Sequence, residues 1–308
     1  MISEKIKNFI TVVKNGSKVN TYKVAWAKAL LEICSEEPSI KIISLEKIAH
    51  KIYKYYWNQT IYFDLLQGNN PTRRAAFLTE VRKDIEKYYI SSKSRQPIHF
   101  ERVEDKLDIN IKKLVSILKL DVSWRFLKIN GEVVDIYQYE KGDNELIIEN
   151  ASEYSDYNSM LSDVINYKWT QVLESFNNAP RIAKKIRVVD FPTLKRKSLT
   201  PFKKYLDVEN PNHVCFICGN AIEKGKVAID HVIPWSYMFS DDLWNFVYVH
   251  QSCNSSKSNI IPSEKEIISL EKRNVRLLEK FEAGNKIYDE LKSAIDGDYV
   301  RKFWVGCK

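Results

Sequence analysis

Four cysteine and histidine residues, both metal-binding types, form two short, matched pairs in the second half of the chain. Cys215 and Cys218 form a CxxC pair, and after 31 intervening residues His250 and Cys253 form an HxxC pair. Zinc prefers four sulfur or nitrogen ligands in a tetrahedron, and a two-residue gap lets both members of a pair reach one ion from a tight turn. The pairs therefore predict a structural zinc site that ties together two distant segments. The alternative is four small buried side chains without a metal.

The remaining cysteines and histidines support this interpretation. Five cysteines in 308 residues are too few for a disulfide scaffold. Three of the five cysteines and three of the five histidines fall within residues 213–253, so the chemistry is concentrated in one segment. His213 is a competing candidate ligand, but its one-residue spacing from Cys215 fits less well.

Composition excludes a membrane protein and a disordered chain. Hydrophobic residues make up 44% of the sequence, charged residues 29%, and the mean hydropathy is −0.37. No stretch approaches the roughly 18 to 20 apolar residues of a membrane span, and the charged N-terminus lacks the pattern of a signal peptide. We expect a soluble globular protein with a buried core, located in the cytoplasm and without a membrane partner.

The first half of the chain has a helical pattern that gives way to a strand pattern. Apolar residues recur at three- and four-residue steps from Lys5 to about Leu118, with predicted helix starts at Pro71-Thr72 and at Asn110. Residues 122–129 and 132–139 flank Asn130-Gly131, which favours the two positive φ angles of a tight hairpin, and residues 144–149 offer a third strand. A small β-meander is therefore expected after the helices.

Two neighbouring segments carry opposite charge. Residues 132–163 contain nine carboxylates against Lys141, which we interpret as a solvated face, with an autoinhibitory cover as the alternative. Residues 181–204 contain nine cations against Asp190. Cations that neutralise phosphates release counterions, so this basic segment, directly before the cysteines, predicts a nucleic-acid contact, with a solvated linker as the alternative. Its cations are Arg181, Lys184, Lys185, Arg187, Lys195, Arg196, Lys197, Lys203 and Lys204.

A second polar group lies inside the zinc frame. Asp230-His231 follows the apolar run 227–229 and precedes Val232-Ile233-Pro234, which predicts a short strand with the pair at its end. Residues 246–250 predict a second strand, and residues 251–259 predict the first turns of a helix. This order places Asp230 and Asn254 where both can face one cation.

This segment resembles the ββα-metal nuclease domain of the HNH endonucleases in its zinc-stapled form. The matching elements are Cys215/Cys218, DHVIPWS, Asn245 and HQSCNSSK, within about residues 210 to 262. The spacing from Asp230 to Asn254 is also similar to that in the HNH domains of RNA-guided DNA nucleases. Two positions differ from the usual family pattern: His250 stands where a cysteine is more common, and Asn254 stands in place of a histidine.

The resemblance implies metal-dependent hydrolysis of DNA phosphodiester bonds. His231 is the candidate general base, since imidazole accepts protons near neutral pH. Asp230 and Asn254 would hold a catalytic Mg²⁺ or Mn²⁺ ion, because their oxygens suit hard cations. Lys257 would add positive charge in the transition state, and Asn245 would brace the loop or orient His231.

The resulting prediction is an α+β protein with three parts. Residues 1–150 form a mainly helical recognition or interaction domain ending in the β-meander, and residues 151–205 form a helix and the basic linker. Residues 206–308 form the ββα-metal (HNH) domain, whose zinc knuckle is followed by two C-terminal helices broken at Ala283-Gly284.

The resemblance also implies a biological setting. Stand-alone enzymes of this type are mostly restriction or phage-defence nucleases, so double-stranded DNA is the expected substrate. Cutting both strands would need either a second site, from a homodimer or a partner subunit, or a repositioning step. Two alternatives stay open: a zinc-dependent nucleic-acid-binding protein with a silent site, and an RNase or toxin on the same fold. The joint presence of Asp230, His231, Asn245, Asn254 and Lys257 argues against the silent site, since simple binding needs none of them.

Overall fold

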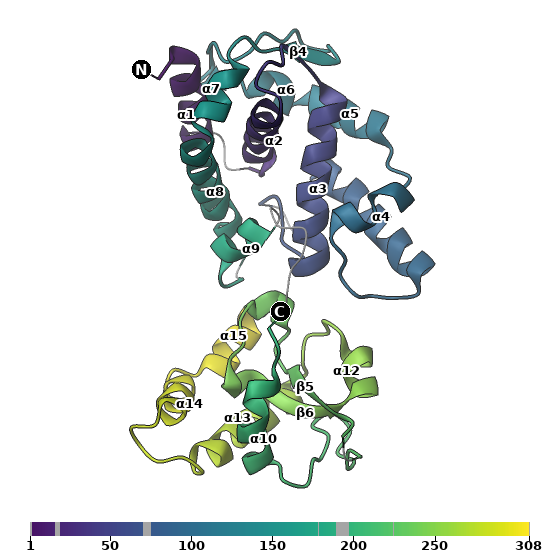
Figure 1. Cartoon of the computed structure of the whole chain (residues 1–308), viewed down its shortest axis with the longest axis vertical. Helices are drawn as coiled ribbons and strands as arrows, with labels where there is room; N and C mark the ends of the chain where they lie inside the picture. The colour runs from purple at the N-terminus through teal and green to yellow at the C-terminus, as the bar shows by residue number, and fades with distance from the viewer. Residues whose placement is uncertain are drawn as a thin grey trace. The chain divides into compact units, whose positions relative to one another are not determined.

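The chain folds into two compact units (Figure 1). The computed structural model describes residues 2–15, 19–69, 75–177, 179–188, 197–223 and 225–307. Unit 1 comprises Met1–Asn177 and Ile182–Thr193, and unit 2 comprises Asn178–Arg181 and Leu194–Lys308. Among the described helices, none combines the length and the apolar composition that a membrane crossing requires.

Unit 1 is mainly helical, as the sequence predicts. Helix α2 is apolar on almost every side and lies beside α3, while α1, α7 and α8 surround α2 and α4 and α5 pack on α3 (Figure 1). The described helices of this unit are α1 (Glu4–Asn15), α2 (Tyr22–Glu36), α3 (Leu45–Phe63), α4 (Ala76–Ser92), η1 (Phe100–Arg102), η2 (Glu104–Lys106), α5 (Ile111–Leu120), α6 (Val122–Arg125), α7 (Ala151–Asp156), α8 (Asn158–Glu174) and α9 (Ile182–Val188).

The sequence predicted the first residues of two helices in unit 1. The Asn110 side chain accepts a hydrogen bond from the backbone N–H of Lys113 and caps α5, as predicted. The start predicted at Pro71-Thr72 lies outside the described residues, and α4 begins at Ala76. Helices α7, α8 and α9, which the sequence suggested as a helix and linker between domains, pack within unit 1.

The strands of unit 1 form two small sheets instead of one meander. Asn130 and Gly131 have φ angles of 51° and 94° and close a hairpin between β2 (Lys128–Ile129) and β3 (Glu132–Val133), as predicted. The predicted strand around Val122 is instead helix α6. The third strand, β4 (Glu145–Ile147), pairs antiparallel with β1 (Ile42–Ser44), a three-residue strand that the sequence did not reveal.

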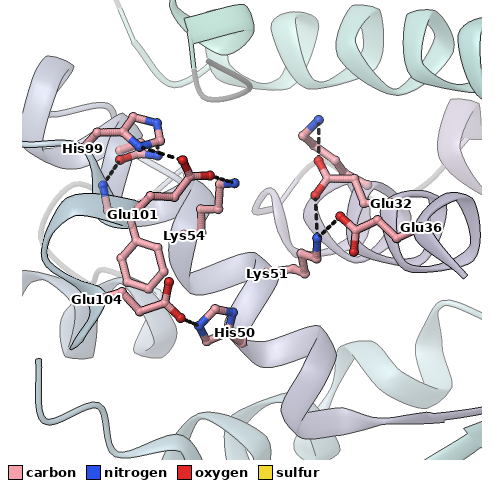
Figure 2. Close-up of polar contacts among 11 residues, drawn as sticks. Glu32, Glu36, His50, Lys51, Lys54, His99, Glu101 and Glu104 are labelled. Carbon is pink, nitrogen blue, oxygen red and sulfur yellow. Dashed lines mark hydrogen bonds and ion pairs between the residues drawn. The ribbon is translucent and has the colours of Figure 1, made fainter. Parts of the chain in front are cut away.

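The basic side chains on one face of α3 are paired with carboxylates inside unit 1. Glutamates of α2, η1 and η2 face them across short distances (Figure 2). The Nζ or Nε2 atoms lie 2.5 to 2.6 Å from carboxylate oxygens in three pairs: Lys51 with Glu36, Lys54 with Glu101, and His50 with Glu104. This face of α3 therefore offers little free positive charge to a phosphate.

Unit 2 is built on one antiparallel hairpin with a helix beside it. Strands β5 (Val227–His231) and β6 (Phe246–His250) pair in a register that runs from Val227 opposite His250 to His231 opposite Phe246. The other described elements of the unit are η3 (Thr200–Phe202), α10 (Lys203–Glu209), α11 (Trp235–Met238), η4 (Leu243–Asn245), α12 (Gln251–Lys257), α13 (Glu264–Leu278), α14 (Lys286–Asp296) and α15 (Tyr299–Cys307). Strand, loop, strand and helix follow the predicted order.

Three helices, not two, cover the hairpin after residue 263. The predicted break at Ala283-Gly284 falls between α13 and α14, where Gly284 has a φ of 86°. A second break follows α14, because Asp298 adopts a left-handed φ of 53° that ends the helix. The three helices bury Leu270, Leu291 and Trp304 in the core of unit 2, so they are part of the folded domain.

Candidate active site and metal centre

The four predicted zinc ligands meet at one end of the hairpin. One ligand atom from each of Cys215, Cys218, His250 and Cys253 lies within 4.8 Å of the others. His250 Nδ1 is 3.4 Å from the Cys218 sulfur and 3.9 Å from the Cys253 sulfur. Tetrahedral zinc with its usual bond lengths keeps its ligand atoms roughly 3.5 to 4 Å apart. The cluster therefore fits a structural zinc ion.

The ring of His250 is oriented for metal binding through Nδ1. Its other ring nitrogen, Nε2, lies 3.2 Å from the carbonyl oxygen of Ala221. A hydrogen bond from Nε2–H to this carbonyl selects the tautomer with a free electron pair on Nδ1, the nitrogen that faces the sulfurs. Histidine in place of the more usual cysteine is thus a competent ligand here.

Two thiols of the cluster have pKa values shifted in opposite directions. Burial tends to raise the pKa of Cys215, but the backbone N–H groups of Cys218, His250 and Ile217 lower this pKa to about 6. Burial and the neighbouring Cys215 and Cys218 raise the pKa of Cys253 to about 11. Thiolates this close together repel one another unless a cation joins them, and a bound Zn²⁺ would supply that cation.

His213, the competing candidate ligand, takes a different role. Its Nε2 lies 2.9 Å from Asp207 Oδ1, and its ring meets Tyr248 edge-on at 5.2 Å. It is not among the four clustered residues. The four residues that the spacing selected are therefore the four that the fold brings together.

Asp230 and Lys257 meet beside the hairpin, between β5 and α12. Lys257 Nζ lies 2.8 Å from Asp230 Oδ2 and 2.5 Å from the carbonyl oxygen of His231. Both side chains are largely buried, at 13% and 10% exposure, so little water screens the pair. The Asp230 carboxylate therefore already faces a positive charge at the site where a catalytic cation was expected.

Asn254 lies one turn before Lys257 on α12, which places both residues on one face of the helix. Its side-chain amide is partly exposed and forms no hydrogen bond with any residue that the structure describes. The amide oxygen is therefore available to a ligand. The sequence placed Asp230 and Asn254 on these two elements, and α12 packs against β5 as that arrangement requires.

His231 has a partner that the sequence did not reveal. Its Nε2 lies 3.1 Å from Oδ1 of Asp241, in the loop between the strands, and its ring meets Phe246 edge-on at 4.6 Å. No described residue hydrogen-bonds Nδ1. The adjacent acids Asp241 and Asp242 were visible in the sequence, but which of them faces His231 depends on the path of the loop.

Asn245 is buried, at 1% exposure, and bonds the backbone that follows β5. Its Nδ2 donates to the carbonyl of Ile233 at 2.9 Å, and its Oδ1 accepts from the N–H of Ile233 at 2.8 Å. Its carbonyl oxygen accepts from the N–H of Val232. These contacts hold the two residues directly after His231.

The predicted basic segment is not one continuous surface. Lys184, Arg187, Lys197, Lys203 and Lys204 are exposed, whereas Lys195 and Arg196 lie outside the described residues. The prediction for Lys185 is wrong: this residue is fully buried, with Nζ 5.7 Å above the ring of Phe63, so it offers no charge to a phosphate. Arg181 donates to the carbonyl of Met238 at 3.0 Å, within unit 2.

Comparison with known families agrees with this geometry. The family model described as HNH endonuclease matches residues 215–263, the segment from the first zinc ligand to the end of α12 and the turn after it. Residues 215–263 form an HNH endonuclease domain. The zinc cluster, Asp230, His231, Asn245, Asn254 and Lys257 all lie within it.

Outside the HNH segment, the comparisons assign no chemistry to the chain. A Domain of unknown function (DUF8808) matches residues 3–116, which cover most of the helices of unit 1. Comparisons with the curated proteins and with the solved structures give no match. The HNH domain is therefore the part of the chain to which a chemistry, that of a nuclease, can be assigned. Helices α13, α14 and α15 lie outside the matched segment.

Proposed function

We propose that the chain is a metal-dependent endonuclease that hydrolyses phosphodiester bonds of DNA at the Asp230-His231 end of the HNH hairpin. The observation that carries this proposal is the meeting of two polar pairs there. The His231 imidazole faces the Asp241 carboxylate, and Asp230 faces the Lys257 ammonium, all within the HNH domain. A domain that only bound nucleic acid would need neither the histidine–acid pair nor the buried carboxylate.

His231 acts as the general base. Asp241 accepts a hydrogen bond from Nε2–H, which leaves Nδ1 unprotonated and able to take a proton from a water molecule. The oxygen of that water attacks phosphorus, the bond to the 3′ oxygen breaks, and the 3′ oxygen leaves as the alkoxide or takes a proton from solvent. Phe246 against the ring restricts its rotation, so the base keeps its orientation.

A divalent cation held by Asp230 and Asn254 would stabilise the charge on the scissile phosphate and the leaving oxygen. The residues fit such an ion, because both offer oxygen atoms, Asp230 already pairs with a cationic group and the amide of Asn254 is free of hydrogen bonds to the described residues. These hard donors favour Mg²⁺ or Mn²⁺. Lys257, which bonds Asp230 and the carbonyl of His231, holds the end of β5 and adds positive charge beside the phosphate.

DNA is the proposed substrate, and the exposed cations of the basic segment are the proposed phosphate contacts. Lys197, Lys203 and Lys204 precede the HNH domain in the same unit, and their exposure leaves their charge available. We assign unit 1 to target recognition or to interaction with a partner. The proposed biological role, restriction or phage defence, rests on the resemblance of the HNH segment to stand-alone enzymes of that kind.

The test uses the purified full chain with its zinc retained. Supercoiled plasmid, linear phage DNA, single-stranded DNA and a structured RNA are incubated with Mg²⁺, with Mn²⁺ and without added divalent ion. The wild-type chain is compared with His231→Ala and with the control His50→Ala, which removes a histidine of unit 1. We expect cleavage of DNA by the wild type and the control, and a loss of about 10²- to 10⁴-fold in His231→Ala.

The outcomes separate the alternatives. Cleavage of RNA alone would transfer the same chemistry to an RNase, and binding without cleavage under every condition would favour the silent site. Equal cleavage by wild type and His231→Ala would refute the assigned base. Nicked circles as the final product would indicate a single site that cuts one strand, whereas linear product would call for a second copy or a partner.

A further inference from the structure

Helices α13 and α14 bond the backbone of the segment that carries Asn245. Arg273 Nη1 donates to the carbonyl of Leu243 at 3.0 Å, and Asn274 Nδ2 donates to the carbonyl of Trp244 at 2.8 Å. From α14, a Glu290 carboxylate oxygen accepts from the N–H of Leu243 at 3.2 Å. Three side chains thus hold both residues directly before Asn245.

Two of these side chains are buried where apolar residues would ordinarily pack. Arg273 is 2% exposed and Asn274 is 1% exposed, and they bond each other at 2.8 Å. Burial lowers the pKa of Arg273 to about 10, and Glu209, 3.7 Å away, opposes this shift, so the guanidinium keeps its charge at neutral pH. A buried charge and a buried amide are costly unless they are hydrogen-bonded. Their hydrogen bonds to the carbonyls of Leu243 and Trp244 offset part of this cost and tie both side chains to one backbone geometry.

The segment 243–245 is hydrogen-bonded in turn to the two residues directly after His231, the proposed general base. Asn245 bonds Ile233 through both polar atoms of its side chain and Val232 through its carbonyl. Val232 follows His231 in the chain. The path from α13 to the general base therefore runs through buried hydrogen bonds at Trp244, Asn245 and Val232, each between 2.8 and 2.9 Å.

We propose that Arg273, Asn274 and Glu290 are positioning residues of the nuclease, which fix His231 by holding Leu243, Trp244 and Asn245. The inference rests on the proposed function and goes beyond it, because α13 and α14 lie outside residues 215–263. Simple packing of the helices would be met by apolar contacts such as those of Leu270 and Leu291. Positioning differs from packing in that its loss should lower the turnover rate more than it lowers stability or substrate affinity.

The experiment compares Asn274→Leu with the control Val275→Ala in the zinc-loaded full chain. Leucine keeps the volume of asparagine approximately but removes both hydrogen bonds, whereas Val275 is exposed and neutral and lies next to Asn274 on the same helix. Single-turnover cleavage, DNA affinity, zinc content and melting temperature are measured, together with hydrogen exchange of the Val232 and Ile233 amides. Glu290→Leu, which removes the bond from α14, provides an independent variant should Asn274→Leu fail to fold.

We expect a cleavage rate about 10- to 100-fold lower in Asn274→Leu, with unchanged zinc content and DNA affinity and faster exchange at Val232 and Ile233, and no change in Val275→Ala. Wild-type rates and wild-type exchange at these two amides in both Asn274→Leu and Glu290→Leu would overturn the inference. So would a uniform rise in exchange across unit 2 with no separate effect on the rate. If the wild type itself cuts no substrate, the proposed function fails, while the exchange at Val232 and Ile233 still decides whether the helices hold the segment.

Discussion

The two ends of the β5–β6 hairpin are held by different means. At the Val227–His250 end, one ligand atom from each of four side chains lies within 4.8 Å of the others, an arrangement that fits one metal ion. At the His231–Phe246 end, hydrogen bonds of Asn245 hold the backbone after β5, and α13 bonds the carbonyl of Trp244, the residue directly before Asn245. We therefore propose a division of labour: a zinc ion would close one end and keep the hairpin folded, while a buried polar network at the other end would set the geometry of the proposed catalytic residues.

The two ends also differ in how far along the sequence the residues that hold them are spread. The four clustered ligands all belong to the segment that matches the HNH family, each pair lies within a short stretch of chain, and a backbone hydrogen bond from Phe216 to Tyr248 holds the two pairs side by side. The other end, which carries the proposed catalytic residues, is hydrogen-bonded by residues as distant in the sequence as Arg273, Asn274 and Glu290. A change at the metal end should therefore affect everything built on the hairpin, whereas a change at the other end should affect the rate selectively.

Removal of the metal site should have the largest effect. In Cys218→Ser the zinc site loses one of its four ligands. Structural zinc contributes on the order of 10 kcal/mol to the folding of small sites. The variant should therefore lose bound zinc, the cooperative melting transition of unit 2 and DNA cleavage together. Zinc content, calorimetry and plasmid cleavage measure the three losses. Cys34→Ser, in the core of unit 1, is the cysteine control that should keep its zinc. Full zinc and full activity in Cys218→Ser would contradict a structural role for the cluster.

Removal of the partner of His231 should have an intermediate and selective effect. Asp241→Ala leaves Nε2 without its acceptor, so the imidazole loses both its tautomer and its orientation, and the cleavage rate should fall about 10- to 100-fold. Zinc content and melting temperature should stay at the wild-type values, since the metal end is untouched. Asp296→Ala, on the exposed face of α14, removes a comparable carboxylate as the control. An unchanged rate in Asp241→Ala would show that His231 is oriented by its own strand and by Phe246 alone.

The cluster at the metal end of the hairpin could be predicted from the sequence because each of its two pairs has metal-binding residue types at a short, recognisable spacing. The order of β5 and β6, the cap at Asn110 and the turn at Asn130-Gly131 were predictable because their patterns are local too. Pairings between distant segments were not: β4 joins β1 across about a hundred residues, and Lys185 turns inward onto Phe63. In α13 a signal was present, since Arg273 and Asn274 interrupt the apolar stripe formed by Ile267, Leu270 and Leu277, but their partners depend on the fold.

Neutralising the exposed cations should have the smallest effect and should spare both ends of the hairpin. In the triple variant Lys197→Gln, Lys203→Gln and Lys204→Gln, DNA affinity should fall several-fold, and the slope of log affinity against log salt should become shallower by about one for each phosphate that the chain no longer neutralises. Cleavage at saturating DNA should keep the wild-type rate, because none of these residues touches the catalytic groups.

Two controls sharpen this last test. Lys292→Gln removes an exposed cation of α14 that is already paired with Asp296, so it should leave the salt slope unchanged. Lys185→Gln alters a buried residue of unit 1 and should lower the melting temperature without changing the salt slope. If the triple variant binds DNA with the wild-type affinity and slope, the phosphate contacts lie elsewhere on the chain. If it instead loses turnover at saturating DNA, the basic segment contributes to the chemistry, and the separation between binding and the catalytic end of the hairpin is wrong.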